Sequence, residues 1–80
     1  MRLDKYLKVS RLIKRRTVAN EACDEQCILV NGRGQKAGYQ VKVGDVIQLS
    51  LGKRVLKVEV LSTEDNVSKA AASAMYKELA

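Results

Sequence analysis

The chain contains no histidine, proline, phenylalanine or tryptophan, and these absences exclude several classes of protein. Without histidine it lacks the commonest general base and most nucleophile–base pairs of enzymes. It also has no glycine-rich loop of the kind that cradles phosphates in nucleotide-binding enzymes. We therefore expect a protein that is not an enzyme. Because tyrosine is its sole aromatic residue type, we expect an aliphatic core.

Long hydrophobic runs are also missing. No stretch approaches the roughly 18 consecutive apolar residues that favour a membrane span. The basic N-terminus is not followed by the apolar run of a signal peptide. We therefore expect a cytoplasmic protein without membrane contact. A chain of 80 residues forms one small domain with a modest core, so we expect a single domain over residues 1–80.

Cysteine is scarce, with Cys23 and Cys27 the two examples. We expect both to be reduced, buried thiols, as is usual in a cytosolic protein. They lie four residues apart and could face each other on a helix. Zinc needs further ligands, and histidine is absent. We therefore expect neither a metal nor a cofactor.

Positive charge is concentrated in residues 1–16, which we call the basic segment. It holds seven of the 15 basic residues and one of the nine acidic residues, so its net charge equals the +6 of the whole chain. The remaining eight basic and eight acidic residues cancel, and Lys53 and Lys69 belong to this neutral remainder. The seven basic residues of the segment are Arg2, Lys5, Lys8, Arg11, Lys14, Arg15 and Arg16.

Three interpretations of this charge compete. It could be a solvated face that aids solubility. It could be a membrane-surface helix, but that needs a larger apolar face than Leu3, Tyr6 and Leu7 supply. It could bind nucleic acid, because clustered Arg and Lys suit phosphate oxygens. The concentration of charge on one segment favours the third interpretation.

The basic segment itself has helical periodicity at its start. Leu3, Tyr6, Leu7 and Ser10 share one arc of a helix and the basic residues the opposite arc. We expect this helix to end near Val9 or Ser10. Residues 11–16 should form a tight connector, with Leu12 and Ile13 pointing inward.

A second helix should begin at Thr17, whose hydroxyl is a plausible N-cap. Its expected apolar stripe consists of Val18, Ala19, Ala22 and Cys23. The free N–H groups at its start would lie beside Lys14, Arg15 and Arg16, a combination that suits phosphate. The acidic residues on its exposed side would repel a DNA backbone in a major groove, so structured RNA fits better.

The period then changes from helical to strand-like. We expect strands over Ile28–Val30, 35–37 and Val46–Leu51, and a returning strand in which Leu56, Val58 and Val60 alternate. Asn31-Gly32 and Gly52-Lys53 should form tight turns. A last helix, capped by Asp65 or Asn66, should run through Leu79. The expected fold class is α+β: two N-terminal helices packed on a small, mainly antiparallel sheet, plus this C-terminal helix.

The order of residues resembles the alpha-L RNA-binding domain, first seen in a small-subunit ribosomal protein. The resemblance spans about residues 2–47, and the hairpin and C-terminal helix expected over 46–79 lie outside this core. Residues 7–17 and 74–76 are similar to the short relatives of heat-shock protein fifteen, in the form that acts at P-site tRNA in ribosome-associated quality control. The residues that carry the resemblance to the alpha-L domain are Arg2 to Leu7, Ser10-Arg11, Arg16-Thr17, Ala19, Val30-Asn31-Gly32, Lys36, Val41 and Gly44-Asp45.

The resemblance implies a function and a set of contacts. The protein would bind large ribosomal subunits that carry a stalled peptidyl-tRNA, contact rRNA and tRNA, and hold the P-site tRNA while a partner factor adds C-terminal alanines. It would be a monomer off the ribosome. The implied RNA contacts are Arg2, Lys5, Lys8, Arg11, Lys14, Arg15, Arg16 and Lys36.

Two supporting residues and one departure accompany this resemblance. Thr17 would support the second helix. Asp4 would either orient neighbouring basic side chains or serve as a simple first-turn acid. The family usually has glycine at the position of Gln26, where a positive φ is expected.

Two alternative functions stay open. One is a general rRNA- or tRNA-binding factor in heat stress or ribosome assembly. The other is the targeting subunit of an RNA-modifying enzyme.

Overall fold

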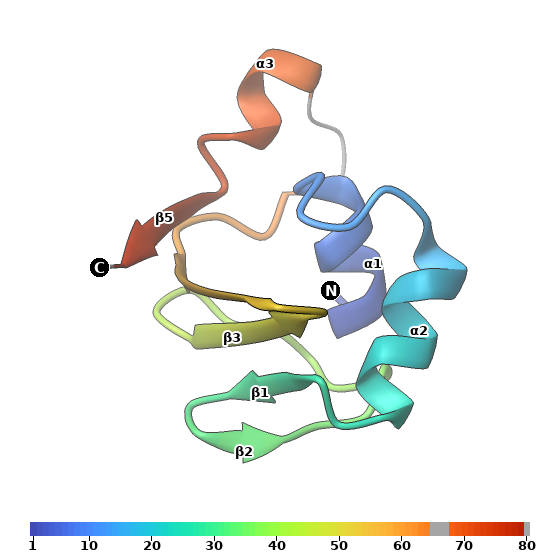
Figure 1. Ribbon diagram of the computed structural model, residues 1–80. Helices are drawn as coiled ribbons and strands as arrows, with labels where there is room; N and C mark the ends of the chain where they lie inside the picture. The colour runs from blue at the N-terminus through green and yellow to red at the C-terminus, as the bar shows by residue number, and fades with distance from the viewer. Residues whose placement is uncertain (65–67, 80) are drawn as a thin grey trace.

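The computed structural model describes residues 1–64 and 68–79, and it has the expected α+β class (Figure 1). An antiparallel sheet with strand order β2-β1-β3-β4-β5 is covered along one side by α1 and α2, while α3 lies near the C-terminal end of α1. The elements are α1 (Leu3–Val9), α2 (Arg16–Asp24), β1 (Ile28–Val30), β2 (Arg33–Gly34), β3 (Val46–Leu51), β4 (Arg54–Val60), α3 (Lys69–Ala72) and β5 (Tyr76–Leu79).

Helix α1 buries the arc that its periodicity predicts. Leu3, Tyr6, Leu7 and Ser10 are all at most 1% exposed. The helix ends at Val9, with Ser10 in the C-cap position. Arg11 then takes a positive φ of 64°, which reverses the chain.

The connector after α1 behaves as expected at Ile13, which is buried. Leu12 is half-buried and packs against the core from its edge. The chain therefore leaves α1 and enters α2 over a short apolar anchor, with its charged side chains outside.

Helix α2 begins earlier than expected, with its N-cap two residues before Thr17. Arg15 takes the extended N-cap conformation (φ −121°, ψ 135°) and Arg16 is the first helical residue, so the expected N-cap at Thr17 is wrong. Ala19, Ala22 and Cys23 form the buried stripe, at i, i+3 and i+4 spacing. Val18 is 45% exposed, because it lies beyond this narrow stripe.

The end of α2 shows why a positive φ is needed at Gln26. The Cys27 N–H donates to the Ala22 carbonyl (2.9 Å) and the Gln26 N–H to the Cys23 carbonyl (3.0 Å). This pair of bonds defines a Schellman motif, whose C′ residue adopts the left-handed conformation. Gln26 does so at φ 58°, as expected.

The sheet is built from two tight hairpins. Asn31 and Gly32 both have positive φ (53° and 82°), as a two-residue hairpin turn requires. The return strand is Arg33–Gly34 rather than the expected 35–37, because such a turn places Arg33 directly opposite Val30. Strands β3 and β4 pair as expected around Gly52-Lys53, from Leu51 opposite Arg54 onward.

The C-terminal helix is shorter than expected. It covers Lys69–Ala72, and Ser68 caps it by accepting from the Ala71 N–H at 3.2 Å; the caps expected at Asp65 or Asn66 lie outside the described residues. The helix expected through Leu79 is wrong there, because Tyr76–Leu79 pairs instead with the edge strand β4. Main-chain bonding along that edge overrides the helix-like spacing of the sequence.

The core is aliphatic, as expected, with Tyr6 as its one fully buried aromatic side chain among the described residues. Of the two thiols, Cys23 is buried and Cys27 is half-buried, so the expectation of two buried thiols holds for one. Burial, followed by the negative charges of Asp4 and Asp24, raises the pKa of Cys23 to about 11. Over residues 1–64 and 68–79, no helix is long and apolar enough to cross a membrane.

Candidate nucleic-acid interface

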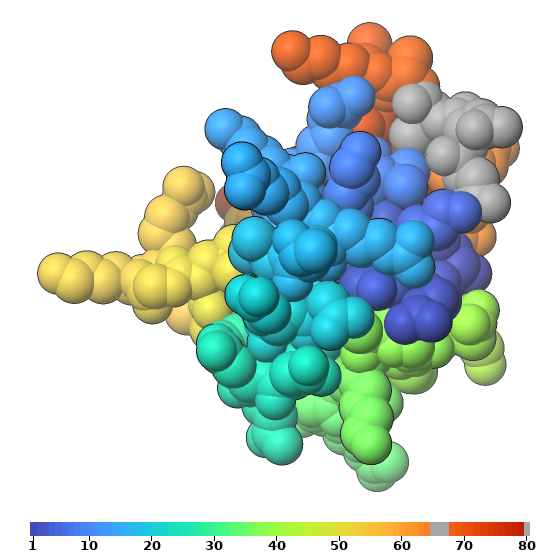
Figure 2. Space-filling model, turned by 90° about the vertical axis from the view of Figure 1, so that its right-hand side faces the viewer, coloured from blue at the N-terminus to red at the C-terminus, as the bar shows by residue number. Residues whose placement is uncertain are grey.

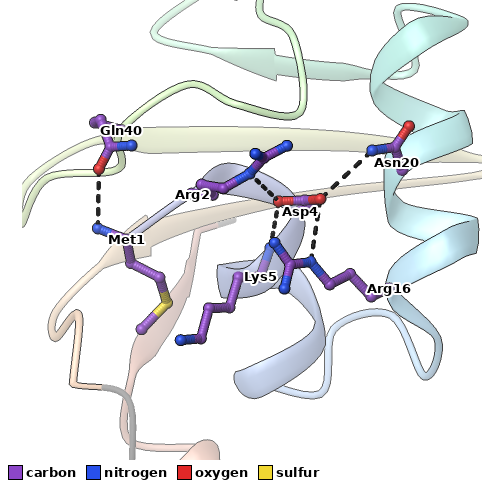
Figure 3. Close-up of polar contacts among 7 residues, drawn as sticks. All are labelled: Met1, Arg2, Asp4, Lys5, Arg16, Asn20 and Gln40. Carbon is purple, nitrogen blue, oxygen red and sulfur yellow. Dashed lines mark hydrogen bonds and ion pairs between the residues drawn. The ribbon is translucent and has the colours of Figure 1, made fainter.

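A buried carboxylate organises the basic segment. Asp4 is 2% exposed, and its two side-chain oxygens accept hydrogen bonds from Arg2, Lys5, Arg16 and Asn20 (Figure 3). We call these five residues the Asp4 cluster. Oδ1 accepts from Arg2 Nε (3.2 Å) and from the Lys5 N–H (2.8 Å). Oδ2 accepts from Arg16 Nε (3.2 Å) and Asn20 Nδ2 (3.5 Å).

These bonds decide the ionisation of Asp4. Burial by itself would raise the pKa of the carboxyl, but hydrogen bonds from Arg16, Asn20 and the Lys5 N–H, with the charge of Arg16, outweigh it. The pKa is therefore below its ordinary value of 3.8, and Asp4 is a carboxylate at neutral pH. Of the two expected roles for Asp4, the structure supports the one in which it orients basic side chains.

Asp4 accepts a hydrogen bond from Nε of each arginine, and the Nη atoms of the two guanidinium groups take no part in these bonds. Their side chains are 50% (Arg2) and 48% (Arg16) exposed. Arg2 precedes α1 and Arg16 starts α2, so one carboxylate holds together two arginines that lie 14 positions apart (16 − 2). A guanidinium fork can donate two parallel hydrogen bonds to a phosphate.

The start of α1 is held by the loop that contains residues 37–40, which follows β2 in the sequence. The Leu3 N–H donates to the Tyr39 carbonyl (2.8 Å) and the Asp4 N–H to the Ala37 carbonyl (3.2 Å). Arg2 pairs with Gln40 as an isolated β-bridge. The first N–H groups of α1 are thus used within the protein, whereas Arg16, Thr17 and Val18 at the start of α2 are exposed residues.

A second buried carboxylate, Asp45, holds that loop in place. It accepts hydrogen bonds from the Tyr39 hydroxyl (2.9 Å), the Lys42 N–H (3.0 Å) and Asn31 Nδ2 (3.1 Å). Burial would raise the pKa of Asp45, but these donors lower it below 3.8. Its role is architectural: it ties the Asn31-Gly32 turn to the loop that supports Arg2.

A shallow hollow of about 410 Å³ lies between α1 and the start of α2, lined by Asp4, Arg16, Thr17, Asn20 and Glu21. Thr17 borders this hollow from the first turn of α2 rather than capping the helix. Figure 2 shows this face, with the blue residues of α1, the connector and α2 spread across it. Lys14, Arg15 and Arg16 are all exposed there.

Lys14 also belongs to a second group of expected contacts, together with Lys8 and Arg11. Lys8, Arg11 and Lys14 line a hollow of about 300 Å³ together with Lys69 of α3; we call this the basic hollow. The sequence gives no signal for Lys69, because it lies 55 positions after Lys14 (69 − 14) in the neutral remainder.

The remaining expected contacts are more dispersed. Lys5 is half-buried and shares the start of α1 with Asp4. Lys36 is exposed beside a different hollow, at the C-terminal end of α2, that Cys23, Asp24 and Gln26 also line. Asn20 was not among the expected site residues; its position four residues after Arg16 on one helix face is the signal that could have found it.

The chain is similar to proteins of one known family. The family model described as S4 domain matches residues 1–47. A protein of Halalkalibacterium halodurans named RQC P-site tRNA stabilizing factor is 49% identical over 77 residues, covering 96% of this chain and 88% of its own length. The protein of that name from Bacillus subtilis is 47% identical over 76 residues, with 95% and 88% covered.

Two solved structures have the same fold. The trimeric structure of Vibrio cholerae heat shock protein 15 matches with a TM-score of 0.92 at 27% identity, over 100% of this chain and 82% of that one. The solution structure of the hypothetical protein HP1423 matches with a TM-score of 0.84 at 30% identity, over 100% and 98%. Both matches extend past residue 47, so they include the β3–β4 hairpin and the C-terminal segment.

Proposed function

This chain belongs to the S4 domain family and, within it, to the RQC P-site tRNA stabilizing factors, and we propose that it is a non-catalytic RNA-binding protein of large ribosomal subunits. There it would contact rRNA and a P-site peptidyl-tRNA during ribosome-associated quality control. By holding that tRNA, it would allow a partner factor to add C-terminal alanines to the stalled chain. This work would take place in the cytoplasm.

The observation that carries the proposal is the Asp4 cluster. A buried carboxylate holds Arg2 and Arg16 by Nε at 3.2 Å each, while about half of each arginine side chain is exposed. Fixing the arginines beforehand reduces the side-chain entropy that binding would otherwise remove. Phosphate oxygens of an RNA backbone suit two guanidinium forks.

The charge of α2 favours structured RNA over the major groove of DNA. After Arg16 the helix carries no basic residue, and Glu21 and Asp24 are exposed on it. A recognition helix inserted into a groove would bring these acids against phosphates. Contact through the start of α2 and the basic segment keeps them outside, and it suits recognition of RNA by shape and backbone.

The test is sedimentation of the tagged chain through a sucrose gradient, with the large-subunit fractions probed for the protein and for peptidyl-tRNA. The Arg16→Gln variant should disappear from those fractions, because the substitution removes one of the two arginines of the Asp4 cluster. The matched control Lys53→Gln removes the same charge at the exposed β3–β4 turn and should remain bound. Equal loss from both variants would contradict the proposal, provided circular dichroism shows both to be folded.

Binding of the purified chain to large subunits should depend strongly on salt. If about five phosphates are contacted, the slope of log K against log salt should be roughly −3.5 to −4.5. A flat dependence would contradict a phosphate interface. Co-purification with assembly precursors would favour the assembly-factor alternative, and one stoichiometric enzyme would favour the targeting-subunit alternative.

A further inference from the structure

The basic hollow brings together cations from two distant parts of the chain. Lys8 lies in the last turn of α1, Arg11 and Lys14 lie in the connector, and Lys69 is the first residue of α3. The S4 domain match ends at residue 47, so Lys69 lies outside it. Figures 1 and 2 both show α3 beside the C-terminal end of α1 and the connector.

This hollow is a concentrated site of positive charge. The four described residues that line it are all cationic, and none of the four forms an ion pair with another described residue. Like charges around one small space repel each other, and an anion placed among them relieves that repulsion. The Asp4 cluster differs, because there a carboxylate of the protein already balances part of the charge.

The position of Lys69 is built into the fold. The Tyr6 hydroxyl donates a 2.7 Å hydrogen bond to the Met75 carbonyl inside the core, which ties the segment after α3 to the middle of α1. That carbonyl also accepts from the Leu61 N–H at 2.8 Å. Ala72 and Met75 are each 1% exposed, so α3 is anchored by its C-terminal end.

The start of α3 is fixed as well. Ser68 Oγ accepts from the Ala71 N–H (3.2 Å), and the Ser68 carbonyl accepts from the Ala72 N–H (2.9 Å). These bonds set Lys69 as the first helical residue, and its exposed side chain borders the hollow.

We propose that Lys69 completes a second phosphate-binding site, in which it joins Lys8, Arg11 and Lys14 around an RNA phosphodiester. The inference rests on the proposed RNA-binding function and extends it beyond the S4 domain to α3. The site would hold a phosphate other than those bound by Arg2 and Arg16, because none of the described residues lines both hollows. Its contribution would be sequence-independent, since phosphate contacts position an RNA without reading bases.

The test compares matched single-charge variants of the full chain in binding to purified large ribosomal subunits over a range of salt. Lys69→Gln should weaken binding and reduce the slope of log K against log salt by about 1. Lys77→Gln, which removes the same charge from an exposed position of β5, should leave the slope unchanged. Lys69→Arg keeps the charge and should retain the wild-type slope.

The outcomes separate the two proposals. If Arg16→Gln weakens binding while Lys69→Gln behaves as Lys77→Gln does, the second site is refuted and the proposed function stands. If the unsubstituted chain fails to bind large subunits, both are refuted. As a measurement independent of affinity, a photo-reactive residue at position 69 should cross-link to RNA, and the same residue at position 77 should not.

Discussion

Replacing Gln26 by glycine should stabilise the protein, because Gln26 occupies a backbone conformation that glycine adopts freely. It is the C′ residue of the Schellman motif after α2, at φ 58°. The two bonds of that motif, from the N–H groups of Gln26 and Cys27, hold the residue there. A side chain in this conformation is crowded by the following carbonyl oxygen.

The magnitude follows from two opposing terms. Left-handed backbone costs an L-residue about 1–2 kcal/mol, and this cost disappears with glycine. The greater freedom of glycine in the unfolded chain offsets roughly 0.5–1 kcal/mol of that gain. Gln26 is exposed and its side chain lies over Gly34, so its removal forfeits little burial. We expect a net gain of about 0.5–1 kcal/mol, which raises Tm by about 2–8 °C.

Thermal melting followed by circular dichroism measures this gain, and urea unfolding checks it at one temperature. Gln26→Ala is the matched control, because it removes the same side chain and keeps the Cβ that causes the crowding. We expect no comparable gain from alanine. A lower Tm for Gln26→Gly would refute the reasoning, and so would an equal rise for both variants. Affinity for large subunits should not change, since Gln26 lies outside the Asp4 cluster and the basic hollow.

Three further predictions concern buried polar groups. Asp4→Asn should lower the free energy of unfolding by about 1–3 kcal/mol at neutral pH. Because the folded-state pKa of Asp4 is below 3.8, the stabilisation by Asp4 is present above pH 3.8 and is lost as the pH falls through that lowered pKa. Denaturation curves of the two proteins should therefore converge in acid. Tyr6→Phe should cost about 0.5–1.5 kcal/mol in urea unfolding, because the hydrogen bond to the Met75 carbonyl is lost; no change would show that the bond does not anchor the C-terminal segment. Cys23, with a pKa of about 11, should resist iodoacetamide at pH 8 while the half-buried Cys27 is alkylated first, as mass spectrometry of peptides would show; the reverse order would contradict the burial of Cys23.

Much of the local structure could be predicted because it depends on near neighbours. The arc of Leu3, Tyr6 and Leu7 identified the buried face of α1, since helical spacing decides which side chains share a face. The Asn31-Gly32 pair identified the hairpin, because few residues tolerate two successive positive φ angles. The positive φ at Gln26 was expected from the family resemblance instead, because the family usually has glycine at that position.

The errors occur where tertiary contacts compete with local preference. The sequence from Ala70 to Leu79 has helix-like spacing, yet the unpaired edge of β4 recruits Tyr76–Leu79 as a strand. Thr17 has the better capping side chain, yet α2 begins at Arg16. In the first turn of α2, Arg16 reaches the Asp4 carboxylate, and local propensity takes no account of that hydrogen bond.

The amino-acid sequence by itself determined that this is a small α+β domain with its net charge in the first 16 residues, because charge, period and turn chemistry are local properties. The tertiary structure decided how that charge is arranged. It made Asp4 the buried holder of Arg2 and Arg16, and it brought Lys69 beside the basic segment through the bond between Tyr6 and Met75. Such long-range placement depends on which surfaces pack together, and no spacing along the chain specifies it.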